Sequence, residues 1–423
     1  MSIEPILAKL FPDTATLNEG GVSVGGVDLR ELATTFGTPL FVYDEATLRA
    51  RCREAAEVFD DGVAFASKSF LCGAMARLAF EEGLCVDVAT GGELDIVLRS
   101  GVPASRVIMH GNNKSREEIA QALAAGVHRL VVDNFDEIGQ LRELVSVASP
   151  LNALVRVTPG VEAHTHEYVR TGQEDTKFGF SVSNGDARRA ITMLQGVPGL
   201  QLHGVHAHIG SQIFEVDGFR ESMSVLGAFT RDDDFDELCV GGGLGVAYVA
   251  GEAAPSIEEW AESMRDAARA AGLRADLRIL AEPGRAIVAQ AGLTIYSVGV
   301  VKPVTQRTYM AVDGGMSDNP RPVLYGSGYE AFDVDHPLAP RPQAVRLVGK
   351  HCESGDVLID QAFLPAQTKA GSLVATPVTG AYGYSMASNY NRVPRPAVIF
   401  VRDGRAREVL RRETFDDLAR LEV

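Results

Sequence analysis

The sequence has few cysteines and no long uncharged apolar run, and each shortage narrows the class of protein. Its five cysteines are odd in number and form no C-x-x-C pair, so we expect reduced thiols in a cytoplasmic protein and no disulfide framework. No apolar stretch approaches the roughly 20 residues that span a bilayer. The first residues, Met1 to Pro5, lack the basic and apolar pattern of a signal peptide. We therefore expect no membrane partner.

Basic residues are also in short supply. The sequence has 40 Lys and Arg residues against 56 Asp and Glu residues, which gives a formal net charge of -16. Such a surface repels nucleic acid and anionic lipid, so neither is an expected partner, whereas a small anionic ligand needs only a local group of donors. A chain of 423 residues with 46% hydrophobic residues is long enough for two domains.

Short β-branched runs alternate with amphipathic segments through the first two thirds of the chain. Eight runs are predicted strands, at residues 63–66, 85–88, 107–109, 130–132, 153–157, 202–207, 238–240 and 277–281. Ser115 opens a predicted helix in capping-box form, with Ile119, Leu123 and Val127 on its buried side. Residues 135–147 have helical spacing as well. Eight βα units predict an α/β fold with a (β/α)8 TIM-like barrel, which we favour over a doubly wound open sheet.

The pattern changes after about residue 298. Strands with little helix between them are predicted at residues 309–312, 344–348, 357–359, 372–376 and 397–401. These indicate a second, β-rich domain, either a small barrel or a sandwich. The first 40 residues also contain β-like pieces such as 22–24, and their spacing leaves open which domain they join.

Unusual polar residues follow several of the predicted strands, where a (β/α)8 barrel has its active site. Lys68 follows the first strand, where desolvation favours imine chemistry, although a surface lysine would fit the same position. His206 and His208 end the sixth strand and, two residues apart, share one face. They could bind a metal, cover the face of an aromatic cofactor, or be hydrogen-bonded core histidines.

The seventh predicted strand ends in glycines, and the eighth ends in an acidic residue, Glu282, with the basic residue Arg285 after it. The glycines at 241–243 and 245 let backbone N–H groups approach a phosphate, and they do not fit the dinucleotide pattern G-x-G-x-x-G because Tyr248 replaces its last glycine. Glu282 can pair with a protonated pyridine nitrogen and Arg285 with a phosphate or carboxylate, although an ordinary ion pair would look the same. Together the strand ends supply the parts of a pyridoxal phosphate site.

These motifs resemble those of the fold-type III pyridoxal-phosphate-dependent decarboxylases, most closely the diaminopimelate decarboxylases. The resemblance runs from residues 37–43 to residues 381–391 and includes Phe65-Ala-Ser-Lys68, the segment 87–93 and His110-Gly-Asn-Asn-Lys114. It implies a cofactor-binding barrel at 41–298 and a C-terminal β domain at 299–423 that residues 1–40 join. It also implies a head-to-tail homodimer with active sites at the interface.

The resemblance assigns roles to individual residues. Lys68 would hold pyridoxal 5'-phosphate covalently, His208 would stack on its ring and Glu282 would meet its pyridine nitrogen. The other implied cofactor contacts are Asp87, Ser211, Gly242, Gly243, Gly284, Arg285 and Tyr382. The implied contacts to the distal end of the substrate are Arg285, Arg321 and Tyr325 for its carboxylate and Glu353 for its ammonium, and Tyr382 is a further implied substrate contact. Cys352, supplied by the partner subunit, would be the proton donor.

The implied reaction is decarboxylation of meso-2,6-diaminopimelate to L-lysine and CO2, the last step of lysine biosynthesis. The nearest alternative is a decarboxylase of another basic amino acid, such as ornithine, arginine or carboxynorspermidine. An ornithine-type enzyme meets a distal ammonium alone and would not need both Arg285 and Arg321. A metal-dependent hydrolase would typically carry its H-x-H pair on the first strand, so no metal is expected. A non-catalytic homologue would usually lack Lys68 or Cys352.

Overall fold

The computed structural model describes residues 7, 9–161 and 176–423, and the chain divides into two compact units. The barrel unit comprises Cys52–Gly245 and Ala254–Ala286, and the β unit comprises Met1–Arg51, Val246–Ala253 and Ile287–Val423. The predicted barrel limits of 41 and 298 therefore need correction, because residues 41–51 and 287–298 cluster with the β unit. The cause is strand pairing: Leu40 to Tyr43 lie antiparallel to residues 292–295 in one sheet.

Eight parallel strands of the described chain form the barrel unit's sheet, in the order β13-β12-β11-β9-β8-β7-β6-β5. They are β5 (Ala64–Ala66), β6 (Cys85–Val88), β7 (Val107–Met109), β8 (Arg129–Val132), β9 (Leu151–Thr158), β11 (Leu200–His206), β12 (Glu237–Cys239) and β13 (Arg278–Leu280), and a short β10 (Phe180–Ser181) pairs with β9. The amide of Ala64 donates to the carbonyl of Ala281, and the amide of Ala281 donates to that of Gly62, both at 2.9 Å. These bonds join the first strand to the last and confirm the predicted barrel over an open sheet.

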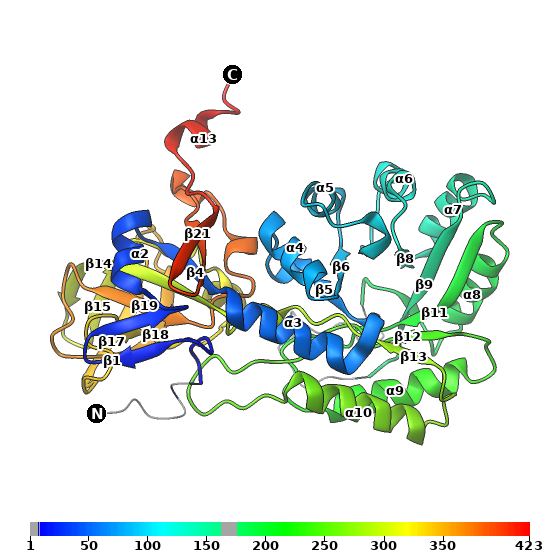
Figure 1. Cartoon of the computed structure of the whole chain (residues 1–423), viewed down its shortest axis with the longest axis horizontal. Coiled ribbons are helices and arrows are strands. Elements are labelled where there is room, and N and C mark those ends of the chain that lie inside the picture. Colours follow the sequence, from blue (N-terminus) through cyan, green and yellow to red (C-terminus); the bar gives the residue numbers. More distant parts are fainter. Residues whose placement is uncertain (1–6, 8, 162–175) are drawn as a thin grey trace. The chain divides into compact units, whose positions relative to one another are not determined.

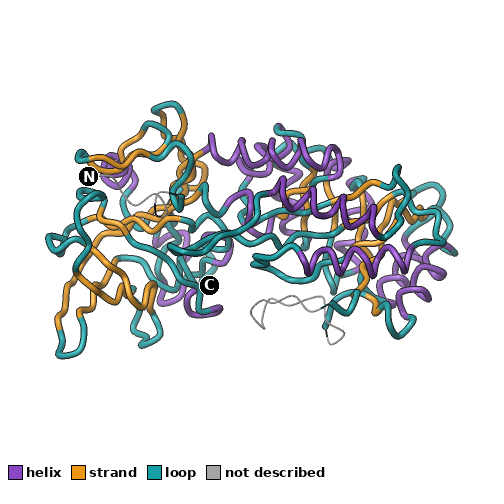
Figure 2. The backbone as a smooth tube through the Cα atoms, turned by 90° about the horizontal axis from the view of Figure 1, so that it is seen from below, coloured by secondary structure: helices purple, strands orange, loops and turns teal. Residues whose placement is uncertain are grey.

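Helices enclose the barrel strands (Figures 1 and 2). They are α4 (Gly73–Glu81), α5 (Gly91–Arg99), α6 (Arg116–Ala125), α7 (Phe135–Leu144), α8 (Asp186–Gln195), α9 (Asp217–Thr230) and α10 (Ile257–Ala270), while α3 (Glu45–Phe59) leads into β5. The predicted capping box is confirmed, since Ser115 Oγ accepts from the Glu118 amide at 3.2 Å and Glu118 Oε2 accepts from the Ser115 amide at 2.9 Å. Leu123 is only half-buried, because Ala122 takes the inward position beside Ile119.

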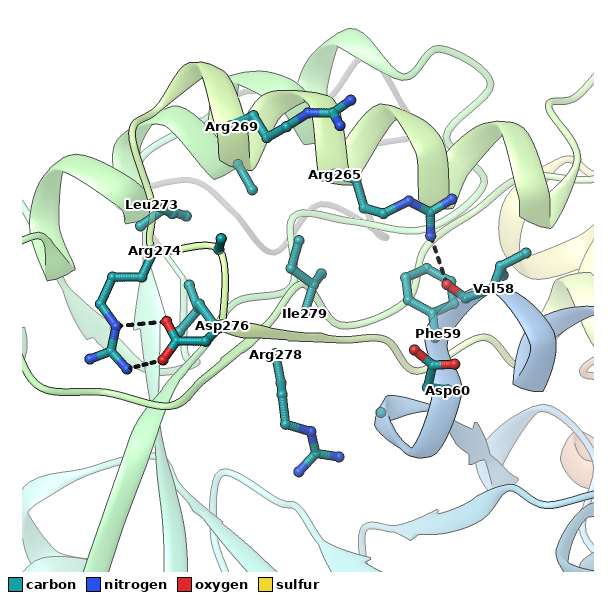
Figure 3. A pocket seen from close by; sticks show the side chains of 14 residues that line it. Val58, Phe59, Asp60, Arg265, Arg269, Leu273, Arg274, Asp276, Arg278 and Ile279 are labelled. Atoms are coloured by element: carbon teal, nitrogen blue, oxygen red, sulfur yellow. Dashed lines mark hydrogen bonds and ion pairs between the residues drawn. The ribbon is translucent and has the colours of Figure 1, made fainter.

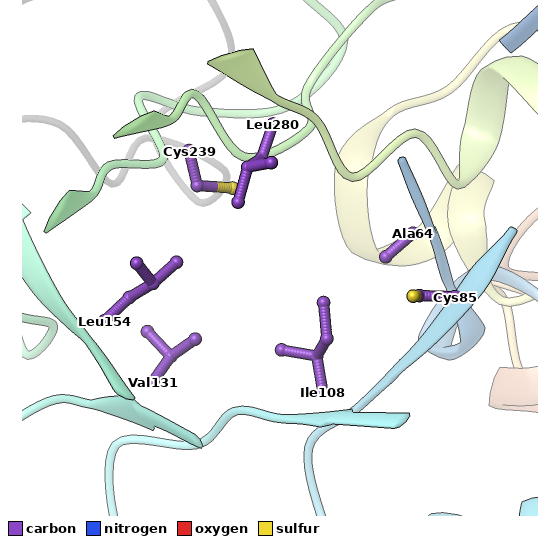
Figure 4. Packing of buried hydrophobic residues seen from close by; sticks show 7 residues of the cluster. All are labelled: Ala64, Cys85, Ile108, Val131, Leu154, Cys239 and Leu280. Carbon is purple, nitrogen blue, oxygen red and sulfur yellow. The ribbon is translucent and has the colours of Figure 1, made fainter. Parts of the chain in front are cut away.

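One layer of apolar side chains fills the barrel interior (Figure 4). Seven strands each contribute one residue, namely Ala64, Cys85, Ile108, Val131, Leu154, Cys239 and Leu280. On β11, a Cβ at Gly204 would lie 1.8 Å from the carbonyl oxygen of Glu237, so only glycine allows β11 to approach β12 this closely. The layer is close-packed and apolar, and polar side chains beyond it must therefore find partners among themselves.

The β unit is built on a sheet in the order β18-β17-β15-β14-β4-β20-β21, with β19 beside β14 and β16 beside β19. The strands are β4 (Leu40–Asp44), β14 (Gly292–Pro303), β15 (Thr308–Val312), β16 (Phe332–Asp333), β17 (Gln343–Val348), β18 (Val357–Leu364), β19 (Leu373–Pro377), β20 (Ala397–Arg402) and β21 (Arg405–Leu410). A smaller sheet joins β1 (Thr16–Asn18), β2 (Gly21–Val24) and β3 (Val27–Asp28), and the helices are α2 (Leu29–Phe36), α12 (Arg321–Tyr325) and α13 (Phe415–Ala419). None of the described helices is long and apolar enough to cross a membrane.

Candidate active site

Polar side chains gather at the carboxyl ends of the barrel strands. They are Lys68 after β5, Asp87 on β6, His110 after β7, His206 at the end of β11 and Glu282 after β13. Parallel strands in a closed barrel end on one face, so these groups share that face. The lysine side chain is exposed, whereas the other four are buried. The desolvation expected at Lys68 is therefore not a feature of this structure.

The Glu282 carboxylate is the centre of this group. Its Oε2 accepts a hydrogen bond from His206 Nε2 at 2.9 Å, and its Oε1 lies 2.9 Å from His110 Nε2. Burial by itself would raise the pKa of Glu282, but the charges and hydrogen bonds of the two histidines hold that pKa well below its usual value. The structure thus keeps an ionised carboxylate inside the barrel mouth.

Asp87 and His110 form a second contact, with Oδ2 and Nε2 3.9 Å apart. Burial raises the pKa of Asp87 to about 6, against the opposing charges of His110 and Lys68. Burial alone would lower the pKa of His110, yet the charges of Asp87 and Glu282 outweigh it and raise that pKa. Lys68 therefore lies near a site whose net charge depends on Asp87, His110 and Glu282 together.

His208 lies beyond the end of β11, in surroundings that favour its neutral form. Burial, followed by the charge of Lys68, lowers its pKa well below the usual value. Its Nδ1 accepts a hydrogen bond from the amide of Gly242 at 3.2 Å, which places the imidazole proton on Nε2. His206 and His208 therefore have different partners and do not act as one H-x-H pair: His206 binds Glu282, while His208 is a neutral flat ring beside the glycine loop.

The glycine loop and the residues after Glu282 pack backbone against backbone. A Cβ at Gly242 would lie 2.3 Å from the Glu282 carbonyl oxygen, and one at Gly284 would lie 2.9 Å from the Ala66 carbonyl oxygen. Gly243 has φ +111°, which a residue with a side chain rarely adopts. Glycine is thus required at these positions because the backbone segments approach one another closely. A plain tight turn would not bring them so close.

Arg285 is the first residue of α11 (Arg285–Val288), and its Nη2 donates to Ser211 Oγ at 2.9 Å. The arginine is buried and Ser211 is half-buried. This pair brings a guanidinium and a hydroxyl, both donors to anions, to the carboxyl end of the barrel.

The remaining predicted site residues lie in the β unit, and Arg321 is the most strongly held of them. It begins α12, is 4% exposed, and its guanidinium lies 4.0 Å from the ring centre of Tyr248 and 5.5 Å from that of Tyr329. Its Nη1 donates to the Tyr329 hydroxyl at 2.5 Å. Tyr325, at the end of the same helix, and Tyr382, with φ +57°, are half-buried. Sequence reasoning missed both supporting tyrosines, since Tyr248 stood out only as a departure from a glycine pattern.

Cys352 and Glu353 are exposed neighbours in the turn between β17 and β18. The turn is fixed by Asp356, whose carboxylate accepts from the amides of Met316 at 2.6 Å and His351 at 2.8 Å. The Tyr390 hydroxyl donates to Glu353 Oε1. Tyr390 was not predicted, because no spacing rule links it to the turn.

A cleft of about 650 Å³ lies at the other end of the barrel, lined by the end of α3, by α10 and by the residues that lead into β13 (Figure 3). Its arginines are engaged in the wall itself: Arg265 donates to the Val58 carbonyl at 2.8 Å, and Arg274 donates to Asp276 at 3.0 Å. The barrel residues predicted to carry chemistry are at the opposite ends of the strands.

Comparison with known proteins places this site in a family. Residues 45–289 match the pyridoxal binding domain of the pyridoxal-dependent decarboxylases. The diaminopimelate decarboxylase of Mycobacterium tuberculosis is 45% identical over 98% of each chain, and that of Bacillus subtilis is 45% identical over 96% of this chain and 95% of the relative. The chain belongs to the diaminopimelate decarboxylases. The crystal structure of the M. jannaschii enzyme in complex with L-lysine has a TM-score of 0.90 at 29% identity, covering 97% of this chain and 98% of that one.

The residues at the barrel mouth fit the pyridoxal cofactor of this family. The exposed amine of Lys68 matches the cofactor's aldehyde, and the buried, ionised carboxylate of Glu282 matches its pyridine nitrogen. The neutral, flat imidazole of His208 matches the aromatic ring, and the guanidinium of Arg285 beside the hydroxyl of Ser211 matches the phosphate.

Proposed function

We propose that this chain decarboxylates meso-2,6-diaminopimelate to L-lysine and CO2, with pyridoxal 5'-phosphate as its cofactor. The observation that carries the proposal is the 45% identity to diaminopimelate decarboxylases over nearly the whole chain, which includes both units. The buried, ionised Glu282 supports it on separate grounds, since a fixed carboxylate is what a protonated pyridine ring needs as a partner.

Pyridoxal phosphate, when bound, supplies a conjugated ring that accepts the electron pair left by the departing CO2. Lys68 would carry the cofactor through its exposed amine. Glu282 would hold the proton on the pyridine nitrogen, and it can do so because it stays ionised although buried. His208 would cover one face of the ring without adding a charge, in keeping with its lowered pKa.

The further cofactor contacts are assigned as the resemblance implies. We propose that the phosphate is bound by Ser211, Gly242, Gly243, Gly284, Arg285 and Tyr382, and that Asp87 also contributes to the cofactor site. The hydrogen bond between Arg285 and Ser211 supports this assignment, because it holds two anion donors side by side.

Substrate selection is proposed to depend on the distal amino-acid end of diaminopimelate. Its carboxylate would meet Arg285, Arg321 and Tyr325, and its ammonium would meet Glu353. Tyr382 would also contact the substrate. The buried guanidinium of Arg321 supports this, since a planar fork held against aromatic rings suits a carboxylate. Ornithine has no distal carboxylate to use it, which disfavours the ornithine-type alternative.

We further propose a cytoplasmic homodimer in which Cys352 of one subunit is the proton donor for the other. All five cysteines are free thiols, and Cys352 is exposed. Mixing inactive Lys68→Ala and Cys352→Ala subunits tests the arrangement. Random pairing makes half the dimers mixed, each with one complete site, so about a quarter of the activity should return. Sites built within single subunits would return none.

The substrate is tested with the purified holoenzyme. We expect L-lysine and CO2 from meso-2,6-diaminopimelate, and no comparable turnover of L-ornithine, L-arginine or carboxynorspermidine. The cofactor is tested by the absorbance band of lysine-bound pyridoxal phosphate, which should be absent in Lys68→Ala. Faster turnover of any of the three other amino acids would replace the proposed substrate but keep the proposed chemistry.

A further inference from the structure

Each oxygen of the Glu282 carboxylate faces a different histidine. His206 Nε2 lies 2.9 Å from Oε2, His110 Nε2 lies 2.9 Å from Oε1, and the two imidazole rings are 5.0 Å apart. All three side chains are at most 10% exposed. They come from the ends of β7, β11 and β13, so the closed barrel, and not local sequence, brings them together.

The two histidines stand in different electrostatic surroundings. His110 lies between two carboxylates, because Asp87 Oδ2 is 3.9 Å from the nitrogen that contacts Glu282. These charges overcome burial and raise the pKa of His110. Burial lowers the pKa of His206 to about 4, against the opposing charge of Glu282. His110 is therefore the more readily protonated member of the pair, and His206 is a hydrogen-bond donor that resists taking up a second proton.

We infer that His110 and His206 are positioning residues for the pyridine nitrogen of the cofactor: His110 keeps Glu282 ionised, and His206 fixes the plane of its carboxylate. This inference rests on the proposed function, and specifically on Glu282 meeting that nitrogen. A carboxylate offers about four lone-pair sites. His206 uses one on Oε2, and the thiol of Cys239, 3.5 Å from Oε1, uses another. His110 lies at ion-pair distance from Oε1, so a site on Oε2 is left for the ring N–H.

Removing the histidines should change Glu282 in a defined way. Burial favours the protonated acid, and a protonated acid cannot hold a proton on the pyridine ring as well. The same contacts would also exist if the histidines only stabilised the core, or if they joined Glu282 in binding a metal, since the donor atoms of the three lie within 4.8 Å of one another. The contact of His206 Nε2 with Oε2, at 2.9 Å, is a direct hydrogen bond, and His110 Nε2 lies at ion-pair distance from Oε1.

The test compares two ligands that differ only at the atom in question. Apoenzyme is titrated with pyridoxal phosphate and with its 1-deaza analogue, in which C–H replaces the pyridine nitrogen. The ratio of the two dissociation constants reports the contact at that position, whereas a general loss of packing changes both constants together. The variants are His110→Gln, His206→Gln and His206→Phe. His203→Gln is the matched control, because His203 is on the same strand and pairs with Asp236, away from Glu282.

We expect the unmutated protein to bind pyridoxal phosphate at least about tenfold more tightly than the 1-deaza analogue, because the analogue loses a hydrogen bond to a charged group. His110→Gln and His206→Phe should lower this preference roughly fivefold or more, since each removes the charge or the donor. His206→Gln should keep most of it, because an amide N–H replaces a neutral donor. His203→Gln should leave it unchanged.

Two outcomes would overturn the inference, and they can be told apart. If His110→Gln and His206→Phe weaken both ligands equally, the histidines only support the core or bind a metal, and the proposed function stands. If the unmutated protein binds both ligands equally well, Glu282 does not meet the pyridine nitrogen, and that part of the proposed function falls as well.

A measurement on the unmutated holoenzyme covers the case in which the variants do not fold. Nitrogen-15 NMR of labelled histidines reports the protons on each ring. Near neutral pH, His110 should carry a proton on both nitrogens and His206 on Nε2 alone, as their opposite electrostatic surroundings dictate. A neutral His110, or a proton on Nδ1 of His206, would overturn the inference without any substitution.

Discussion

The ammonium of Lys114 lies 2.9 Å from the carboxylate of Glu137, and the two side chains are 0% and 2% exposed. The same ammonium donates hydrogen bonds to the backbone carbonyls of Gly111 and Val131. Burial raises the pKa of Glu137, against the charge and hydrogen bond of Lys114. Because Gly111 follows His110, this ion pair fastens the loop that carries His110 to the beginning of α7.

Replacing Lys114 with Met would leave the Glu137 carboxylate buried without its cation. We expect the free energy of unfolding to fall by about 3–5 kcal/mol, the usual cost of breaking a buried ion pair from one side. Urea unfolding followed by circular dichroism measures the change. Arg116→Met is the matched control, because its ion pair with Glu143 is 2.6 Å long but at least half exposed, and its loss should cost less than about 1 kcal/mol. Equal losses in the two variants would contradict the prediction.

His128, at the amino end of β8, should make the fold sensitive to acid. Burial, and then the charges of Arg129 and Arg106, lower the pKa of His128 to about 4. A histidine in the unfolded chain has a pKa of about 6.5, so the unfolded state binds this proton more readily. The stability that the neutral ring contributes is complete above about pH 6.5 and is lost as the pH falls toward 4.

The variant His128→Gln isolates this effect, because its amide does not titrate. We expect the urea midpoint of the unmutated protein to fall, relative to that of the variant, as the pH is lowered from about 7 to about 5. Other titrating groups contribute equally to both proteins and cancel in the difference. A difference that stays constant over this range would show that His128 is not held neutral in the folded protein.

The barrel could be predicted from the sequence because the alternation of short β-branched runs and amphipathic segments is repeated eight times. Predicted and observed bounds differ by no more than two residues at each of the eight strands, and those at 85–88 and 107–109 agree fully. The domain limits could not be predicted in the same way. Leu40–Asp44 is as apolar as a barrel strand and all five residues are buried. Only its partner in space, β14, decides that it joins the other sheet, and periodicity along the chain carries no information about that partner.

The candidate site was predictable where chain order alone decides the position. Lys68 and Glu282 were found because each comes two residues after the end of a strand, and all barrel strands end on one face. The contacts between strands were not found. Nothing in the spacing links His110 to Glu282, since their meeting depends on barrel closure. The tyrosine rings around Arg321 were equally hidden, because Tyr248 lies in the short segment Val246–Ala253 that leaves the barrel unit for the β unit.

Cys352→Ala should slow product formation while leaving the cofactor in place. Among the five cysteines, all within the described chain, Cys352 alone is exposed, which suits a thiol that gives up a proton. Loss of a positioned general acid typically costs about 10²- to 10⁴-fold in rate. L-Lysine formation measures the rate, and the absorbance of bound pyridoxal phosphate measures occupancy. Cys85→Ala, in the apolar layer of the barrel, is the control and should turn over normally. A Cys352→Ala enzyme that loses the absorbance band would not fit the role of proton donor.

Arg321→Lys should weaken substrate binding without disturbing the cofactor. Lysine keeps the charge but loses the planar fork and the stacking on Tyr248 and Tyr329. We expect KM for meso-2,6-diaminopimelate to rise by roughly 10- to 100-fold, which corresponds to a hydrogen bond between charged groups. Steady-state kinetics measures KM, and the cofactor absorbance should not change. Tyr329→Phe removes only the hydroxyl that accepts from Arg321, so its effect should be smaller and in the same direction.

Product inhibition shows whether Arg321 binds the distal carboxylate or only supports the fold. L-Lysine keeps that carboxylate, whereas cadaverine has the same carbon chain without it. If Arg321 meets the carboxylate, Arg321→Lys should weaken inhibition by L-lysine roughly tenfold or more and change inhibition by cadaverine little, because only L-lysine loses a charged contact. Equal weakening of both inhibitors would mean that the substitution deforms the pocket as a whole. Arg321 would then be a structural residue of the β unit, and the choice of substrate would depend on other side chains.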